Sequence, residues 1–423
     1  MLQETVDEAE IIQRVAALDV GKAEVVCCVR VPGPDGKRAQ EVMAYSTMTR
    51  SLQLLAERLR ELEVTRVVME ATSDYWRPPF YLLEANGFEV WLVNARDVKH
   101  LPGRPKADKI DAVWLCKVAE RGMVRPSFVP PAPIRQLRDL TRYRIDLVGE
   151  RTREKNRVEK LLTDAQIQLS VVASDIFGVS GRAMMAALVA GERDPKVLAQ
   201  MARARMRAKL TELEEAFHGR FSDHHAFLLA TMLARIDAID TDLAAVETRI
   251  EDLIAPFAEF TEAVARLDTI PGVGSTTAQV ILAEVGLDMS RFPTAGHLAS
   301  WAKFSPITSE SAGKKKGKNA TGKGNPYLAR ALGEAAVAAA KTDTFLGERY
   351  RRIARRRGKK KAIVALGRSI LTIIWHLLSD PDTQFVDLGP NFYDTRGGTQ
   401  HAIRHHIRRL QALGYQVTLH PAA

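Results

Sequence analysis

Cysteine is scarce in this sequence, with three residues in a chain of 423. Cys27 and Cys28 are adjacent, so on a β-strand their side chains would point to opposite faces, and Cys116 is distant from both in the sequence. Three such cysteines are too few for a disulfide framework. The chain also lacks the Cys-x-x-Cys pairs that bind zinc. We therefore expect a protein of a reducing, cytosolic compartment.

Long apolar runs are also missing. The longest, at residues 362–378, is interrupted by Arg368 and His376, and it is too short and too polar to span a bilayer. The first ten residues are acidic, whereas a signal peptide begins with basic residues. The hydrophobic fraction of 46% is still sufficient to build a core. These features predict a soluble, intracellular protein without a membrane partner.

Acidic residues are outnumbered by basic ones, 51 against 61, which gives a net charge of +10. Residues 314–361 alone contain sixteen Lys or Arg and three Asp or Glu, an excess larger than that of the whole chain. This density predicts contacts with phosphate groups and a steep salt dependence of binding, although a solvated basic surface is the simpler alternative. Composition leaves DNA, RNA and an anionic membrane open as partners.

The first 130 residues predict an α/β domain. Its β-branched runs and its apolar residues at helical spacing alternate along the chain. The predicted elements are strands at residues 14–20, 23–31, 41–47, 65–70 and 88–94, and helices at residues 51–62, 76–86 and 108–121. Three early strands followed by alternating helices and strands predict a mixed, RNase H-like sheet with flanking helices.

The rest of the chain predicts helices. Prolines between residues 126 and 133 mark a linker. Residues 131–262 carry apolar residues at three- and four-residue spacing, which predicts long antiparallel helices, as a coiled coil or as a simple bundle. Residues 263–379 predict a mostly α-helical domain. Residues 380–423 predict a small basic extension with one helix and a final strand. We therefore expect four domains, the first ending at residue 130.

Four carboxylates accompany the elements of the first domain. Asp19 ends the first predicted strand and Glu70 the fourth, whereas Asp108 and Asp111 are three residues apart on one face of a helix. Converging carboxylates form a hard-oxygen site that suits Mg²⁺ or Mn²⁺, and two such ions about 4 Å apart can promote phosphoryl transfer. Taken singly, each acid is more simply a surface charge, and Asp108 could cap its own helix.

A tight turn, Pro271-Gly272-Val273-Gly274, leads into a predicted helix. This is the pattern of a helix-hairpin-helix, whose glycines allow backbone N–H groups to approach phosphates at a helix N-terminus. Such a motif binds the nucleic acid backbone without sequence preference. The alternative is a turn between two helices with no ligand.

Three segments of the first domain resemble a known family. LDVGKAEVVCCV, VVMEATSDYWRPPFYLLEANGFEVWLVNARDVKH and KADKIDAVWLCK are similar to the N-terminal domain of the DEDD-type insertion-sequence transposases, the IS110 family. The resemblance implies a RuvC-like, RNase H-type domain in which Asp19, Glu70, Asp108 and Asp111 hold the metal. The family pattern usually has Thr before the third acid, and Ala107 in that place leaves the acids where they are.

The segment LASWAKFSPITSESAGKKKGKNATGKGNPYLARAL resembles the C-terminal transposase domain of the same family. The resemblance places an essential serine at Ser311. The family usually has Gly directly after this serine, whereas here Ala312 intervenes, so Ser309 is a near alternative and Ser305 a remote one. The residues that we expect to bind nucleic acid are Lys22, Gly272, Gly274, Lys314, Lys315, Lys316, Lys318, Lys323, Asn325 and Arg330.

The resemblance implies a bacterial, cytoplasmic transposase or site-specific recombinase. The hydroxyl of Ser311 would attack a DNA phosphodiester and hold the strand covalently, once a base or metal activates it. The family also implies a structured guide RNA that selects donor and target double-stranded DNA, and a dimer or tetramer whose protomers share each site. Two alternatives stay open: a Holliday-junction resolvase-like nuclease in which the acids activate water, and a non-enzymatic nucleic-acid-binding scaffold.

Overall fold

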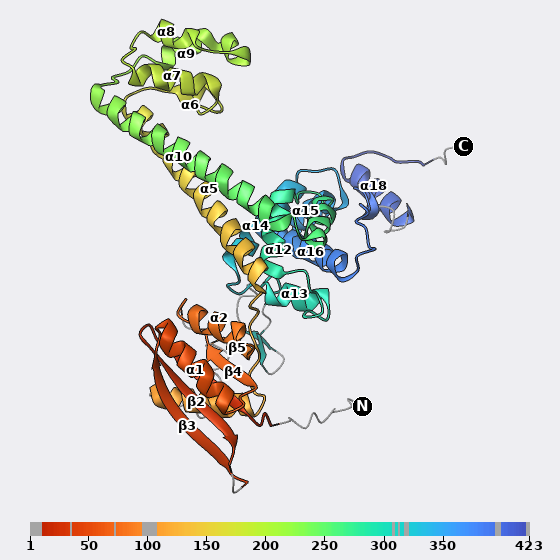
Figure 1. Cartoon of the computed structure of the whole chain (residues 1–423). Coiled ribbons are helices and arrows are strands. Elements are labelled where there is room, and N and C mark those ends of the chain that lie inside the picture. Colours follow the sequence, from red (N-terminus) through yellow and green to blue (C-terminus); the bar gives the residue numbers. More distant parts are fainter. Residues whose placement is uncertain are drawn as a thin grey trace. The chain divides into compact units, whose positions relative to one another are not determined.

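The computed structural model describes residues 11–33, 36–71, 73–94, 108–306, 309–311, 314–316, 321–393 and 399–419. The chain separates into two compact units, Met1–Pro130 and Pro131–Ala423 (Figure 1). Each unit has hydrophobic clusters of its own, and each is described by itself below.

The first unit contains a five-stranded mixed sheet in the order β3-β2-β1-β4-β5. β1 is antiparallel to β2 and parallel to β4, β2 is antiparallel to β3, and β4 is parallel to β5. The strands are β1 (Val15–Val20), β2 (Glu24–Pro32), β3 (Arg38–Ser46), β4 (Arg66–Glu70) and β5 (Glu89–Val93). The predicted mixed sheet is confirmed, and its strand order fits an RNase H-like fold.

Burial follows the position of each strand in this sheet. β1 is buried on both faces because it is central, whereas β3 alternates between half-buried and exposed residues as an edge strand does. The helices α1 (Thr49–Glu61) and α2 (Arg77–Ala85) share a core with one face. The helix α4 (Asp108–Glu120) shares a core with the other face. Cys27 lies in the first core and Cys28 in the second, so the prediction of opposite faces is confirmed.

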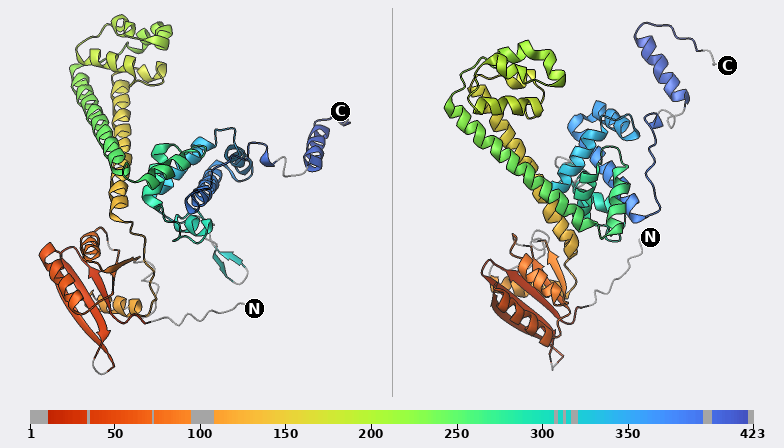
Figure 2. Two further views of the ribbon diagram at one scale, coloured as in Figure 1. Left: turned by 45° about the vertical axis from the view of Figure 1, so that its right-hand side comes forward. Right: turned by 45° about the horizontal axis from the view of Figure 1, so that its top comes forward.

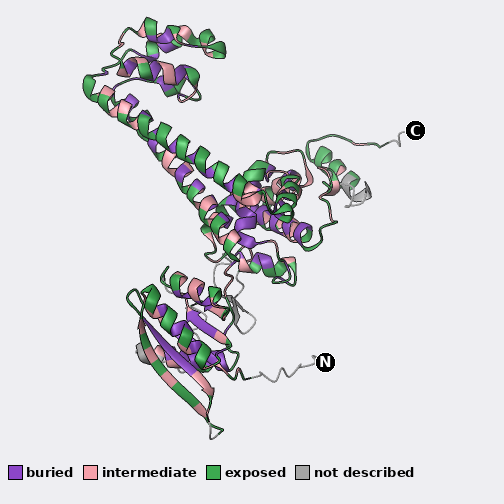
Figure 3. Cartoon of the chain, viewed as in Figure 1, coloured by how far each residue is buried: buried purple, intermediate pink, exposed green. Residues whose placement is uncertain are grey.

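The second unit begins with an arm of two long helices, α5 (Ala132–Asp164) and α10 (Asp223–Ile254). Asp164 contacts His225 at 3.2 Å, and Arg151 contacts Asp240 at 2.6 Å, so the helices run antiparallel (Figure 2). The buried residues of α10 recur at intervals of three and four, and they face α5, whereas the outer surfaces are exposed (Figure 3). The predicted long antiparallel helices are confirmed.

Short helices between α5 and α10 form a separate cluster at the far end of the arm. They are α6 (Leu169–Val172), α7 (Val179–Val189), α8 (Pro195–Gln200), the 3₁₀ helix η1 (Ala204–Lys209) and α9 (Leu210–Ala216). Their core includes the fully buried side chains of Met184 and Met185. This cluster therefore has a hydrophobic core distinct from the one at the base of the arm.

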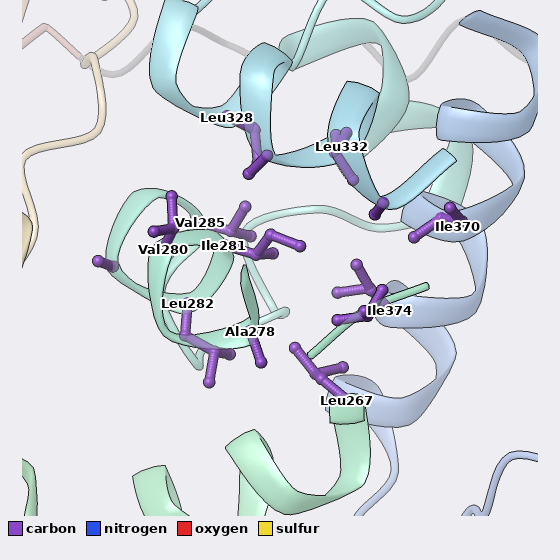
Figure 4. Packing of buried hydrophobic residues seen from close by; sticks show 14 of the residues in the cluster. Leu267, Ala278, Val280, Ile281, Leu282, Val285, Leu328, Leu332, Ile370 and Ile374 are labelled. Carbon is purple, nitrogen blue, oxygen red and sulfur yellow. The ribbon is translucent and has the colours of Figure 1, made fainter. Parts of the chain in front are cut away.

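The base of the arm packs on the helices that follow it. They are α11 (Ala258–Asp268), α12 (Ser275–Val285), α13 (Ala295–Trp301), α14 (Pro326–Ala339), α15 (Phe345–Arg357) and α16 (Lys359–Ser379). Figure 4 shows Ile281 of α12, Leu332 of α14 and Ile374 of α16 meeting in this core. The same cluster includes Leu137 of α5 and Ile250 of α10, so the arm and these helices share one hydrophobic core.

Within the described residues, α16 is the one helix long and apolar enough to cross a membrane. The prediction that residues 362–378 are too short and too polar to span a bilayer is therefore wrong by this test, although the side chains of Leu366, Ile370 and Ile374 are fully buried in the helical core. The last described segment holds the basic helix α18 (Thr399–Ala412), as predicted. The prediction of a final strand is wrong, because residues 415–419 form no strand and pair with neither of the described sheets.

Candidate active site

Two of the predicted carboxylates end neighbouring parallel strands. Leu18 of β1 pairs with Met69 of β4, and Asp19 and Glu70 each follow one residue later. Leu18 and Met69 belong to the core beneath α1 and α2. Because side chains alternate along a strand, Asp19 and Glu70 face the opposite side of the sheet, which α4 covers. Both side chains are half-buried. The register thus brings these two acids together at the carboxyl ends of two neighbouring parallel strands.

The last turn of α4 is fixed at the start of β1. The backbone N–H of Ile12 donates to the carbonyl of Glu120 at 2.9 Å. The Glu120 carboxylate pairs with Arg30 at 2.9 Å and Arg38 at 2.5 Å, and its side chain is only 7% exposed. These contacts tie α4 to β2 and β3 as well, so the helix has one fixed direction across the sheet.

The direction of α4 carries its first turn toward Asp19. The thiol of Cys116 contacts the carbonyl of Val15 at 3.5 Å. Together with the hydrogen bond between Ile12 and Glu120, this contact shows that α4 runs antiparallel to β1. Asp108 lies about 12 Å from Cys116 along the helix. Asp19 lies about 13 Å from Val15 along the strand. The two lengths match, so the start of α4 and the end of β1 lie at the same level of the domain.

The positions of the two α4 acids share the face that packs on the sheet. Asp108 precedes the buried Ala112 by four residues, and Asp111 precedes the buried Leu115 by four. Asp111 is half-buried, whereas the side chain of Asp108 lies outside the described residues. Among the side chains that are described, no three His, Cys, Asp or Glu form a metal-binding group.

The predicted nucleophile lies on a small hairpin of the second unit. β6 (Ser309–Ser311) and β7 (Lys314–Lys316) are antiparallel, with Ser311 opposite Lys314 and Ser309 opposite Lys316. Ala312 and Gly313 join the strands and lie outside the described residues, as does Lys318. An isolated antiparallel bridge also joins Pro306 and Thr321. We call residues 303–325 the serine segment.

Gly272 and Gly274, the two glycines of the predicted helix-hairpin-helix, have different surroundings. Gly272 has a φ of +87°, and a Cβ added there would lie 2.4 Å from the carbonyl oxygen of Ala335 on α14. Its missing side chain therefore permits close packing within the protein. Gly274 is the N-cap of α12, and its nearest neighbour would be Asp268 at 4.0 Å. Of the two, Gly274 leaves room for an approaching group.

The other predicted nucleic-acid ligands differ in how they are engaged. Lys22 and Lys323 are exposed, and Arg330 is exposed but forms an ion pair with Glu334 at 2.8 Å. The amide of Asn325 makes hydrogen bonds within the protein, to Glu284 and to the first turn of α14. The side chains of Lys314, Lys315 and Lys316 lie outside the described residues.

Sequence reasoning missed a buried ionic cluster around Glu284. This carboxylate is fully buried, and Arg142 donates two hydrogen bonds to it at 2.7 and 2.8 Å. Arg138 lies 3.3 Å from the same carboxylate. The sequence signal was an acid inside the apolar run VILAEVG, which requires a partner when the helix is buried.

Comparisons with known proteins match both regions. The family model for the DEDD transposases of the IS110 type matches residues 16–167. The model for the IS116/IS110/IS902 family of transposases matches residues 264–351. Together they cover more than half of the chain, and they include the strand-end acids and the serine hairpin described above.

Whole-chain relatives agree with these models. The chain is 29% identical to the insertion element IS110 uncharacterized 43.6 kDa protein of Streptomyces coelicolor, over 66% of this chain and 72% of that protein. It is 26% identical to a probable family 20 transposase of Pseudomonas aeruginosa, over 76% and 86%. It is also 26% identical to the transposase for insertion sequence element IS1111A of Coxiella burnetii, over 76% and 80%.

Among solved structures, RuvC of T. thermophilus in complex with a Holliday junction substrate matches 27% of this chain and 100% of its own, with 14% identity and a TM-score of 0.20. The family models decide the assignment instead. Their DEDD type indicates dependence on a divalent metal ion. Transposases are enzymes, which excludes the scaffold alternative. With one model on the carboxylate domain and the other on the helical unit, the chain belongs to the IS110 family of transposases, which cut and rejoin DNA.

Proposed function

We propose that this transposase cuts and rejoins DNA through a covalent bond between Ser311 and a DNA phosphate. Asp19, Glu70, Asp108 and Asp111 would hold Mg²⁺, with Mn²⁺ as the substitute. The observation that supports the proposal best is the sheet register, which sets Asp19 and Glu70 side by side under the start of α4. The donor set consists of carboxylate oxygens, which are the ligands that these hard cations prefer.

The chemistry balances without an external energy source. The Oγ of Ser311 bonds to phosphorus while the bond from phosphorus to a deoxyribose oxygen breaks, and the hydroxyl proton passes to that leaving oxygen. A second deoxyribose hydroxyl then attacks the same phosphorus and releases the serine, so one phosphodiester replaces another. A bound divalent metal supplies Lewis acidity for the charge that develops on the oxygens. The energy of the bond is retained, so ATP is not required.

Phosphate contacts would come from the basic residues around the serine segment. Lys314, Lys315 and Lys316 form the strand opposite the serine, and Lys318 and Lys323 follow it. Lys22 follows β1, the strand that carries Asp19, and Gly274 exposes the N-terminus of α12. We propose that these groups hold the backbones of donor and target double-stranded DNA, because lysine side chains and helix N-termini bind phosphate.

We also propose that a structured guide RNA selects the DNA sites and that the active form is a homo-oligomer, either a dimer or a tetramer. The strongly basic second unit supports an RNA partner, since base contacts are not needed for such binding. Sequencing the nucleic acid that purifies with the protein tests the RNA. Recovery of one discrete RNA species would support the guide-RNA proposal, whereas recovery of only random fragments would contradict it.

The serine is tested by replacing Ser311 with Ala, with Ser309→Ala as the matched control on the same strand. The purified protein is incubated with Mg²⁺ and a labelled DNA duplex that matches the co-purified RNA. We expect a covalent protein–DNA adduct with the wild type and with Ser309→Ala, and none with Ser311→Ala. Asp19→Asn should remove adduct and cleavage together. Continued cleavage by Ser311→Ala without an adduct would instead indicate a nuclease that uses water. An adduct that is absent only from Ser309→Ala would show that Ser309, and not Ser311, is the nucleophile.

A further inference from the structure

The fully buried Glu284 ends α12 where the serine segment returns to the core. Its carboxylate accepts the two hydrogen bonds from Arg142 of α5. Arg138 of α5 also donates to the backbone carbonyls of Ala283 and Glu284, at 2.9 and 3.0 Å. A buried carboxylate is stable only when it is paired and hydrogen-bonded in this way. Glu284 is therefore held at a fixed point between two helices.

Asn325 connects this fixed point to the end of the serine segment. Its Nδ2 donates to the Glu284 carboxylate at 2.5 Å. Its Oδ1 accepts from the backbone N–H groups of Tyr327 and Leu328, at 3.0 and 3.2 Å, as the N-cap of α14. Asparagine can do both because its amide has a donor end and an acceptor end. Serine or aspartate would cap the helix equally well but would lack the amide donor.

Tyr327 adds a second contact with the arm. The guanidinium of Arg142 lies 4.8 Å from the centre of the Tyr327 ring. The Tyr327 hydroxyl donates to Asp146 of α5 at 3.3 Å. Arg142 therefore contacts Glu284 and Tyr327 together, and the start of α14 is held from the α5 side as well as from α12.

The other end of the serine segment is held by close packing. A Cβ added to Gly367 of α16 would lie 2.7 Å from the ring of Phe304, so the absence of a side chain there makes room for this ring. A Cβ added to Gly324 would lie 2.8 Å from the carbonyl oxygen of Ala302, so the two ends of the segment touch each other. Together with the bridge between Pro306 and Thr321, both strands of the loop are fixed at their base.

We propose that Glu284, Arg142 and Asn325 are positioning residues for the nucleophilic serine. The proposal rests on the proposed function, in which Ser311 attacks DNA from the end of this segment. Fixing the base of a short hairpin restricts where its tip can lie. A misplacement of about 1 Å in a reacting group costs about a hundredfold in rate. The cluster would therefore act on the rate of attack, and not on the binding of DNA.

The test replaces Asn325 with Ser, which keeps the helix cap and removes the amide donor to Glu284. Two quantities are measured: hydrogen exchange of backbone amides in residues 302–306 and 321–328, and the rate of adduct formation on the labelled duplex. We expect faster exchange in these two stretches and an adduct rate lower by about ten- to a hundredfold. The affinity for the duplex should stay near the wild-type value. The unfolding temperature should fall by less than in a variant that removes the Glu284 charge, because Arg142 and Arg138 still pair with the carboxylate.

The matched control is Asp194→Ser, which makes a similar change at the N-cap of α8, in the cluster at the far end of the arm. It should change neither quantity. The reversed pair, Glu284→Gln with Asn325→Asp, restores one amide and one carboxylate and should recover part of the protection. Wild-type exchange and wild-type adduct rate in Asn325→Ser would overturn the proposal. If the wild type itself forms no adduct, the serine chemistry fails, and hydrogen exchange alone still decides whether the cluster fixes the segment.

Discussion

Replacing Glu284 with Gln should destabilise the second unit strongly. The substitution conserves size but removes the charge that Arg142 and Arg138 face, and it turns one acceptor toward Asn325 into a donor. Removing one member of a buried ion pair costs about 3–5 kcal/mol, because the remaining charge is buried without a counter-charge. For a unit of this size, each kcal/mol lowers the unfolding temperature by about 2–4 °C. The expected decrease is therefore about 6–20 °C.

Scanning calorimetry of the full chain measures this decrease, and circular dichroism checks that the helical content at low temperature is unchanged. The matched control is Glu334→Gln, which removes an acid that is 63% exposed and paired with Arg330. An exposed ion pair contributes about 0–1 kcal/mol, so this variant should unfold close to the wild type. If Glu284→Gln unfolds within the same small range as Glu334→Gln, the buried cluster is not a major source of stability and our reasoning about it is wrong.

Three further predictions concern single positions or pairs of neighbours. Gly272→Ala should lower the free energy of unfolding because the new Cβ would lie 2.4 Å from the backbone of α14. Gly333→Ala, in open space within the same helix, should raise the free energy of unfolding by about 0.5–1 kcal/mol, and urea unfolding compares the two variants. Burial raises the pKa of Cys27, so the folded protein at pH 8 should resist iodoacetamide at this thiol, and mass spectrometry of the native and urea-unfolded protein checks it. Replacing Arg356 and Arg357, both exposed on α15, with Gln should lower the salt dependence of DNA binding by about one unit of slope for each phosphate that is no longer bound, measured by titration at several salt concentrations.

Much of the first unit could be predicted because its signals are local. A strand buried on both faces has a continuous apolar run, and β1 and β4 have such runs before Asp19 and Glu70. The acids at the ends of these runs, and the pair Asp108 and Asp111 at one helix spacing, are visible without a structure. The long helices α5 and α10 were visible for the same reason, since their apolar spacing repeats over many turns.

The structure changed the meaning of residues whose contacts lie far away in the sequence. Gly272 matched a phosphate-binding pattern, yet its missing side chain makes room for α14, more than sixty residues later. Asn325 was predicted to contact a nucleic acid strand, yet its amide is bonded to Glu284 and caps α14. Such contacts depend on how helices pack, and no short sequence window contains that information.

The sequence by itself predicted the class of fold, and it named four acids and a serine-bearing segment as candidates, because each depends on residue types at short spacing. The resemblance to the IS110 family is carried by the same short segments, and the family models confirm it. Only the tertiary structure decided that Asp19 and Glu70 share a sheet face, that α4 runs back across that face, and that Glu284 holds the end of the serine segment. The physical reason is separation along the chain. Periodicity shows which residues are buried, but the partner of a buried charge is set by packing between elements up to about 140 residues apart.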